Sequence, residues 1–378
     1  MPRFDYYINS SYSSADWQLD REILSILNSE DIYGFHSSFR KYAPTPLLSL
    51  PNLASVLGVK NIMVKDESKR FGVQAIKSLG ALYAMSKILE THTGRQTFCT
   101  ATDGNHGWAV AYAARYFDQK AVVFVPENTV KSRIENIENE NADVHVVKGD
   151  YDHAVEEARL YAKQKPAILI QDTSWDGYEM IPAMITVGYL TQMLEIEDQI
   201  GDEEKPFFDF VILQGGVGTW PSSVVHYYKS TYSENSPKIM IAEPYESDCL
   251  LESAKRKKRS ITRKSQRTVM AGLNCGTPSK IAWKILEKGV DAFISIPDEY
   301  AVRAMKQFYN PMKDDPQIES GEAGAAGLGA LMAMMLEKEL ENIKKKMGVN
   351  KDSNILIFNT EGITDPVFFQ ENITTPIP

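Results

Sequence analysis

A lysine at the start of a predicted helix marks the stretch of this sequence best suited to covalent chemistry. Lys77 opens a helical pattern over residues 77–89, at the end of a loop that begins near residue 65. The positive end of a helix dipole disfavours a charged amine, so this position predicts a lowered pKa and a nitrogen that can form a Schiff base. Most single lysines at helix ends are solvated surface groups. The chemical interpretation therefore depends on motifs elsewhere in the chain.

Asp103 lies in a second polar segment, Thr102-Asp103-Gly104-Asn105-His106-Gly107, between a predicted strand and a predicted helix. The glycines of this segment allow the backbone and short polar side chains to approach a flat ligand closely. By itself the pattern predicts only a turn. A carboxylate here is a candidate general base, which makes Asp103 the informative residue of the segment.

A glycine-rich turn, Gln214-Gly215-Gly216-Val217-Gly218-Thr219, follows an apolar strand at 210–213 and precedes a helix. A strand, a glycine turn and a helix N-terminus together present several amide donors to an anion, which favours a phosphate site. The sequence lacks a Gly-x-x-x-x-Gly-Lys-Ser/Thr motif. It also lacks a Gly-x-Gly-x-x-Gly motif after the first strand, so nucleotide binding is disfavoured.

Three adjoining segments carry a resemblance to a known family: Lys65-Asp66-Glu67-Ser68, Arg70-Phe71-Gly72 and Lys77-Ser78-Leu79-Gly80. Together they resemble the cofactor-lysine region of the fold-type II pyridoxal-phosphate enzymes, and within them the ammonia-lyases of 2,3-diaminopropionate. The similarity runs in the same order from about residue 42 to residue 365. It implies an α/β protein like the tryptophan synthase β subunit, with pyridoxal 5'-phosphate in a cleft between two three-layer, parallel-sheet domains.

The resemblance also implies a role for each motif. Asn105 would bind the phenolic oxygen of the cofactor, the amides of its loop would hold the substrate carboxylate, and Thr360 would face the pyridine nitrogen. The implied cofactor-binding residues are Lys77, Asn105, Gly215, Gly216, Val217, Gly218, Thr219 and Thr360, and the implied catalytic residues are Lys77, Asp103 and Asp172. Without the resemblance, Asp172 is equally well explained as a turn cap. The family usually has small residues where this chain has Trp220-Pro221, which leaves the shape of its phosphate site open.

The implied reaction is α,β-elimination of D- and L-2,3-diaminopropionate to pyruvate and ammonia. A neutral partner for the pyridine nitrogen suits elimination rather than transamination. Two alternatives stay open: a dehydratase of serine or threonine, and a pyridoxal-phosphate-binding protein without turnover. The Asp-Gly-Asn-His-Gly form of the segment around Asp103 argues against the dehydratase.

Composition indicates a soluble metabolic enzyme with a small amino-acid substrate. The 378 residues carry a formal charge of −9, which argues against nucleic acid or an acidic membrane as partner. No signal peptide or apolar run of about 20 residues is present, so we expect a cytoplasmic protein. The cysteines have no metal-ligand spacing and we expect no metal; Cys99, Cys249 and Cys275 are expected to be buried thiols. A homodimer is the family expectation.

Short apolar runs alternate with helical patterns from residue 60 onward, which predicts a parallel sheet with crossover helices. We expect a large domain from residues 1–65 and 176–378 and a smaller inserted domain from residues 66–175. The predicted strands lie at 62–64, 97–100, 121–125, 144–147, 167–170, 210–213, 238–242, 292–295 and 355–358. The predicted helices lie at 20–27, 77–89, 106–116, 131–139, 153–163, 181–196, 222–228, 280–286, 300–308 and 324–346.

Overall fold

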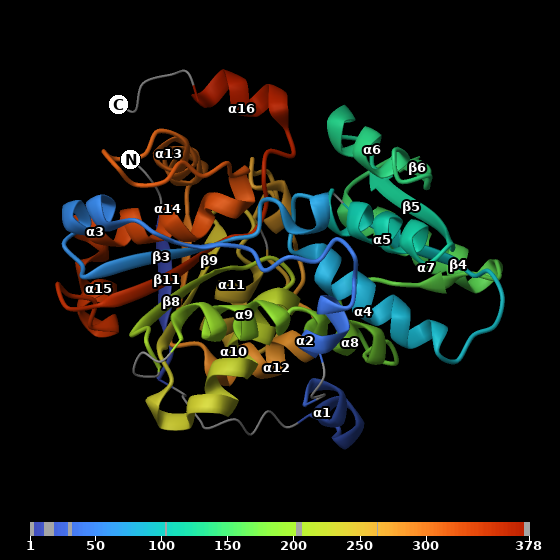
Figure 1. Cartoon of the computed structure of the whole chain (residues 1–378), viewed down its shortest axis with the longest axis horizontal. Coiled ribbons are helices and arrows are strands. Elements are labelled where there is room, and N and C mark those ends of the chain that lie inside the picture. Colours follow the sequence, from blue (N-terminus) through green and yellow to red (C-terminus); the bar gives the residue numbers. More distant parts are fainter. Residues whose placement is uncertain are drawn as a thin grey trace.

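Two sheets organise the chain, whose computed structural model describes residues 4–10, 19–28, 32–102, 104–201, 206–262 and 264–373. In these ranges a seven-stranded sheet has the order β1-β10-β9-β8-β11-β3-β2, and a four-stranded sheet has the order β6-β5-β4-β7 (Figure 1). Neighbouring strands are parallel except for the edge pairs β1–β10 and β2–β3. The strands are β1 Asp5–Ile8, β2 Leu47–Ser49, β3 Asn61–Asp66, β4 Thr97–Ala101, β5 Lys120–Pro126, β6 Asp143–Val147, β7 Ile168–Leu169, β8 Phe210–Gln214, β9 Lys238–Pro244, β10 Ala292–Ile296 and β11 Asn354–Asn359.

Helices connect the parallel strands, as the alternating sequence pattern predicts. They are α1 Arg21–Leu27, α2 Ile32–Ser37, α3 Pro51–Leu57, α4 Lys77–Leu89, α5 Asn105–Tyr116, α6 Lys131–Glu138, α7 Tyr151–Gln164, α8 Met180–Gly188, α9 Thr191–Ile200, α10 Thr219–Tyr232, α11 Cys249–Arg256, α12 Lys280–Gly289, α13 Asp298–Tyr309, α14 Glu322–Leu336, α15 Glu341–Met347 and α16 Pro366–Ile373. None of these described helices is both long and apolar enough to cross a membrane.

All nine predicted strands are present, two of the predicted helices are each split in two, and the helix predicted at 222–228 is longer than expected, at Thr219–Tyr232. The helix expected at 181–196 is interrupted at Tyr189 and Leu190, where the backbone hydrogen bonds tighten to 3₁₀ spacing. The helix expected at 324–346 is interrupted because Glu337 adopts an extended conformation. The edge strands β1 and β2 and the short helices α2, α3, α11 and α16 were not predicted, because each is too short to show a clear period.

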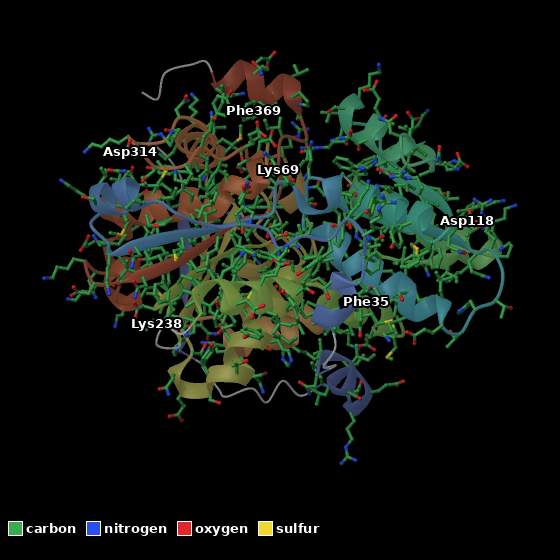
Figure 2. The ribbon with its side chains drawn as sticks, in the orientation of Figure 1. Phe35, Lys69, Asp118, Lys238, Asp314 and Phe369 are labelled. Atoms are coloured by element: carbon green, nitrogen blue, oxygen red, sulfur yellow. The ribbon has the colours of Figure 1, made fainter. Side chains whose placement is uncertain are left out.

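Helices cover both faces of each sheet. One face of the larger sheet shares a hydrophobic core with α3, α13, α14 and α15 (Figure 1). The opposite face shares a second core with α8, α10 and α12. The smaller sheet packs α5 against one face and α7 against the other. Side chains fill the space between the ribbons, and the labelled Asp118 and Lys238 lie on opposite sides of the molecule (Figure 2).

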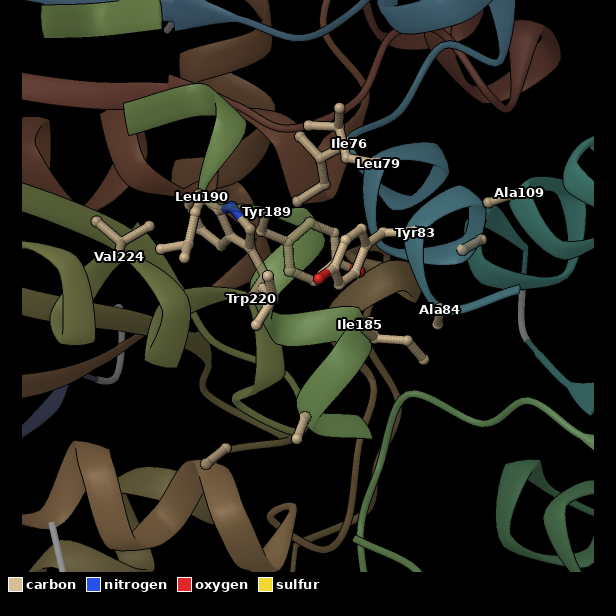
Figure 3. Packing of buried hydrophobic residues seen from close by; sticks show 14 of the residues in the cluster. Ile76, Leu79, Tyr83, Ala84, Ala109, Ile185, Tyr189, Leu190, Trp220 and Val224 are labelled. Carbon is tan, nitrogen blue, oxygen red and sulfur yellow. The ribbon is translucent and has the colours of Figure 1, made fainter. Parts of the chain in front are cut away.

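Helix α4, which begins at Lys77, lies between the two sheets and packs on both α5 and α8. Its apolar residues join Ile185, Trp220 and Val224 in one core that extends from the larger sheet to Ala109 of α5 (Figure 3). Each helix has a glycine at the point where α4 crosses α8: Gly80 in α4 and Gly188 in α8. A Cβ atom on Gly80 would lie 2.7 Å from Ile185 Cγ2, and one on Gly188 would lie 2.6 Å from Leu79 O. The two backbones are therefore in direct contact.

A buried ion cluster, defined here as Lys65, Glu67, Arg70 and Glu195, anchors the loop that leads from β3 to Lys77. Lys65 Nζ lies 2.7 Å from Glu195 Oε2, and the Arg70 guanidinium lies 2.7 Å from carboxylate oxygens of both Glu67 and Glu195. The four side chains are at most 1% exposed. Thr45 donates a hydrogen bond of 2.6 Å to Glu67 Oε1, which ties the cluster to the segment before β2. The residues that carry the family resemblance before Lys77 thus have a structural partner in α9.

The charge of Glu195 is strongly favoured in this cluster. Burial alone would raise the pKa of its carboxyl, but hydrogen bonds and ion pairs with Arg70 and Lys65 outweigh burial and lower the pKa to about 2. Stability from this carboxylate is therefore fully present above its ordinary pKa of 4.5, and is lost as the pH falls from there towards 2.

We expect Glu195→Ala to lower the free energy of unfolding by about 3–5 kcal/mol, because it leaves two buried cations without this partner. Urea unfolding at neutral pH measures the loss. Glu90→Ala is the matched control, since it removes a 58% exposed carboxylate paired with Lys87 and should cost about 0–1 kcal/mol. Between pH 4.5 and 2 the Glu195 variant should lose less stability than the unsubstituted protein. Equal losses in the Glu195 and Glu90 variants would contradict an anchoring role.

Candidate active site

Lys77 and Asp172 form an ion pair in a cavity between the two sheets. Lys77 Nζ donates a hydrogen bond to Asp172 Oδ2 at 2.7 Å, and their side chains are 20% and 6% exposed. Lys77 is the first residue of α4, and Asp172 lies just beyond β7 at the carboxyl edge of the smaller sheet. The structure thus brings together two predicted catalytic residues that are 95 positions apart in the sequence.

The predicted pKa shift of Lys77 is wrong in direction. Burial does lower the pKa of its amine, but the Asp172 carboxylate outweighs burial and raises the pKa above its ordinary value. Burial would likewise raise the pKa of Asp172, but the charge of Lys77 outweighs burial and lowers the pKa to about 2. The helix-dipole argument failed because the sequence does not show which carboxylate lies beside the lysine.

His106 lies beside the Lys77–Asp172 ion pair. Its Nε2–H donates to Ile170 O at 2.8 Å, and its Nδ1 lies 3.8 Å from Asp172 Oδ2. Burial lowers the pKa of His106, which favours the neutral imidazole. Nδ1 then has a lone pair and no hydrogen-bond partner among the described residues. Asp172 therefore has Lys77 as its ion-pair partner and lies beside a neutral ring that donates no hydrogen bond to it.

The glycine turn at 215–218 meets the N-terminus of α10 at the other side of the cavity. Gly218 has a φ of +94°, and a Cβ atom there would lie 2.8 Å from Leu286 Cδ1. A Cβ atom on Gly215 would lie 2.6 Å from Ile241 Cγ2. Both positions therefore require glycine. The Thr219 hydroxyl donates to Asp172 O, which links this turn to the lysine's partner.

Asn105 and Glu361 are hydrogen-bonded to each other in the wall of the cavity. Asn105 Nδ2 donates to Glu361 Oε2, and Ala323 N donates to Glu361 Oε1 at 3.0 Å. Because a carboxylate only accepts hydrogen bonds, Glu361 fixes which end of the Asn105 amide points towards it. The second Nδ2 hydrogen remains for another acceptor. Asp103, two positions before Asn105, lies outside the described residues.

Backbone hydrogen bonds hold Lys77 beside the segment after β11. Ile76 N donates to Thr360 O at 3.2 Å, and Gly362 N donates to Gln74 O at 2.8 Å. Gln74 has a φ of +54°, which a non-glycine residue adopts only when its surroundings hold it there. The pairing sets the position of the lysine relative to Thr360.

One cavity collects most of the predicted site residues. Its lining includes Lys77, Asn105, Asp172, Gly216, Val217, Gly218, Thr219 and Thr360. Gly215 lies behind this wall, against β9. The lining also includes four ionisable residues to which the sequence analysis gave no role: His106, Tyr151, Glu361 and Cys275. His106 and Glu361 adjoin predicted residues, which was an available signal, whereas Tyr151 has no motif around it.

Trp220, which departs from the family pattern, packs into the core next to the cavity. Its side chain is 4% exposed, its Nε1–H donates to Gln192 Oε1 at 2.8 Å, and its ring meets Phe358 edge to face. These contacts tie the first turn of α10 to α9 and β11. Trp220 therefore supports the glycine turn from its core side.

Two thiols at or near the cavity remain free, and a separate group of three carboxylates is paired with cations. Cys99, Cys249 and Cys275 are free thiols; Cys99 and Cys249 are buried as expected, whereas Cys275 is only partly buried. Cys249 Sγ donates to Gly216 O at 3.6 Å, and burial raises the pKa of Cys275 to about 12. In the described ranges, the carboxylates of Asp5, Asp248 and Glu252 gather within 4.8 Å of one another. Each of the three is paired with a cation, and these are Lys255, Lys264 and Arg256.

Comparison with known proteins identifies the family. A family model described as pyridoxal-phosphate dependent enzyme matches residues 39–349. The chain belongs to this family. It is 38% identical to the diaminopropionate ammonia-lyase of Escherichia coli strain K12, over 89% of each chain. The crystal structure of the Escherichia coli lyase in complex with an aminoacrylate-PLP azomethine intermediate has a TM-score of 0.89 and covers 99% of this chain and 97% of that one, at 35% identity. The L-threonine dehydratase of Staphylococcus epidermidis is 25% identical over 75% of this chain and 63% of its own.

The fold-type II class is thereby confirmed, and pyridoxal 5'-phosphate is the cofactor of this pyridoxal-phosphate-dependent enzyme. The cavity fits that cofactor. It offers a primary amine for an aldehyde at Lys77, and a helix N-terminus behind a glycine turn for a phosphate. The turn includes Gly218, whose place a side chain would fill.

We expect Asp172→Asn to lower the pKa of Lys77, because an opposite charge within 4–6 Å shifts a pKa by about 1–3 pH units. Covalent attachment needs the neutral amine, so the pH profile of cofactor attachment to the apoenzyme should move to lower pH by that amount. Absorbance of the bound cofactor measures the rate. Asp176→Asn, which removes a 92% exposed carboxylate paired with Lys280, should leave the profile in place. An unshifted profile for the Asp172 variant would show that another group sets the charge of Lys77.

Proposed function

We propose that this enzyme eliminates ammonia from 2,3-diaminopropionate, in its D and L forms, to give pyruvate and a second ammonia. The observation that carries the proposal is the Lys77–Asp172 pair in one cavity with the glycine turn. The 38% identity to a diaminopropionate ammonia-lyase, over 89% of both chains, supports the choice of substrate.

The residues around Lys77 have distinct proposed roles towards the cofactor. Lys77 Nζ would hold it covalently, and the turn from Gly215 to Thr219 would hold its phosphate at the N-terminus of α10. Asn105 would donate its free Nδ2 hydrogen to the phenolic oxygen, and the Thr360 hydroxyl would face the ring nitrogen. When bound, the cofactor supplies an electron sink for the charge that develops at Cα.

Lys77 and Asp172 together would move the proton from Cα. Lys77 Nζ, as a neutral amine not bonded to the cofactor, would accept the Cα proton. Asp172, whose pKa is lowered to about 2, would then hold the resulting ammonium by the ion pair described above. Ammonia departs from Cβ, and the three-carbon product hydrolyses to pyruvate and ammonia.

Asp103 would serve as the base for the opposite face of the substrate. One lysine reaches only one face of a planar adduct, so the mirror-image substrate needs a base on the other side. A carboxylate can act in this role when it lies within hydrogen-bond reach of the proton. We assign Lys77 to the L isomer and Asp103 to the D isomer.

The dehydratase alternative ranks second, since the threonine dehydratase relative is only 25% identical. The alternative of a binding protein without turnover rested on the Trp220-Pro221 departure, and the packing of Trp220 accounts for that residue without it. We further propose a smaller domain at residues 66–175, supported by the four-stranded sheet within that range, and a cytoplasmic homodimer. Sedimentation analysis of the purified chain tests the dimer.

We expect Lys77→Ala to abolish both turnover of diaminopropionate and the adduct that borohydride traps between cofactor and protein. Lys87→Ala, on the same helix but 38% exposed, should retain both. Because the alanine leaves Asp172 without its partner, the double variant Lys77→Ala, Asp172→Asn serves as a second test with no unpaired charge. Pyruvate release measures turnover. Turnover by a folded Lys77 variant at the rate of the unsubstituted enzyme would disprove the mechanism.

We expect Asp103→Asn to depress turnover of D-diaminopropionate by ~10²–10⁴-fold, the range typical of a general base, and to affect the L isomer much less. The substitution keeps size and hydrogen bonding while it removes the base. The measurement is kcat/KM for both enantiomers, compared as losses of transition-state stabilisation. Equal losses for the two enantiomers would mean that Asp103 orders the site as a whole.

A further inference from the structure

Gln171 holds the hydroxyl of Tyr151 in an orientation that its partners determine. Gln171 Oε1 accepts hydrogen bonds from Ala101 N and the Thr100 hydroxyl, each at 2.9 Å. The other end of the amide, Nε2, donates to Ala101 O at 3.1 Å and to the Tyr151 oxygen at 2.8 Å. A backbone N–H can only donate and a carbonyl can only accept, so these partners fix which end of the amide is which. The amide therefore donates to Tyr151.

The hydroxyl hydrogen of Tyr151 is consequently left for another acceptor. Its oxygen accepts from Gln171, and the hydroxyl donates no hydrogen bond to another described residue. Tyr151 is the first residue of α7 and lines the same cavity as Lys77 and Asp172. Burial, followed by the charge of Asp172, raises the pKa of Tyr151 well above its ordinary value, so the hydroxyl stays protonated. The cavity therefore has a preset hydrogen-bond donor at this wall.

Tyr178 provides an internal contrast. It is held by the same segment, with its oxygen accepting from Gln171 N at 2.8 Å and its hydroxyl donating to Leu169 O at 2.9 Å. Both of its hydrogen-bonding functions are satisfied within the protein, and it does not line the cavity. The two tyrosines thus share a neighbour and differ in whether a hydrogen remains for a ligand.

The chemistry of an amino-acid substrate selects the acceptor. Its α-amine is consumed by the bond to the cofactor, and a protonated β-amine only donates hydrogen bonds. The carboxylate only accepts, and it has two oxygens. Through Gln171, Tyr151 is tied to Ala101, which directly precedes the loop at 102–105 whose amides are proposed to hold that carboxylate.

We propose that Tyr151 binds the substrate by donating a hydrogen bond from its hydroxyl to the α-carboxylate. This inference rests on the proposed function for its choice of an amino-acid substrate. It adds a side-chain donor to the backbone amides, and it applies equally to both enantiomers and to any β-substituent. Tyr151 then selects amino acids over simple amines.

The test compares the holoenzyme with its Tyr151→Phe and Tyr178→Phe variants. Serine and ethanolamine are titrated against each protein and followed by the absorbance of the cofactor; ethanolamine is serine without its carboxylate. We expect Tyr151→Phe to weaken serine binding by ~10- to 100-fold, as for one lost hydrogen bond to a charged group, and to leave ethanolamine binding unchanged. Affinity for the cofactor should not change. Tyr178→Phe should lower the melting temperature without altering either titration.

Three outcomes would overturn the proposal. Equal losses for serine and ethanolamine would place the hydroxyl against a group other than the carboxylate. A fall in cofactor affinity would mean that Tyr151 binds the cofactor, and unchanged serine binding would leave it a packing residue. Failure of the proposed function is distinguishable, because an enzyme that does not turn over diaminopropionate still reports serine and ethanolamine binding.

Discussion

The geometry of the active site depends on a salt-bridge network that touches no substrate. Glu195 of α9 reaches both Lys65 at the end of β3 and Arg70 in the following loop, and the network is closed to solvent. Two cations and two anions balance there, so the cost of desolvating each is offset by close partners. From this fixed point only a few residues lead to Lys77, and the pairing of Gln74 to Ile76 with the segment after β11 guides them. The larger sheet therefore sets the position of the Lys77 amine.

The sequence alone predicted most residues of the site, but not the residues that contact them in the folded chain. The nine predicted strands and the start of α4 follow from periodicity and turn residues, because those signals are local. The charge state of Lys77 depends on Asp172, and that of Glu195 depends on Arg70, in each case across a separation that no local pattern encodes. Tyr151 was missed for the same reason, since its function comes from the amide of Gln171. Motifs identify reactive groups, whereas tertiary contacts set their protonation and orientation.

The binding of the cofactor and the state of the lysine share one physical connection. Thr219, at the end of the glycine turn, donates its hydroxyl to the backbone carbonyl of Asp172, whose side chain holds Lys77. The backbone of Asp172 is thus bonded to the turn that is proposed to hold the phosphate, while its side chain is paired with Lys77. Trp220 restrains the same turn from the core side through Gln192. The anion site and the covalent site are therefore built as one unit.

The glycine contact between α4 and α8 has a mechanical consequence. Where Gly80 and Gly188 cross, backbone meets backbone, so no flexible side-chain layer exists to let one helix roll over the other. The start of α4, and with it Lys77, is therefore held at a fixed separation from α8. A methyl group at either glycine would force the two helices apart, and the Lys77 amine would move with α4.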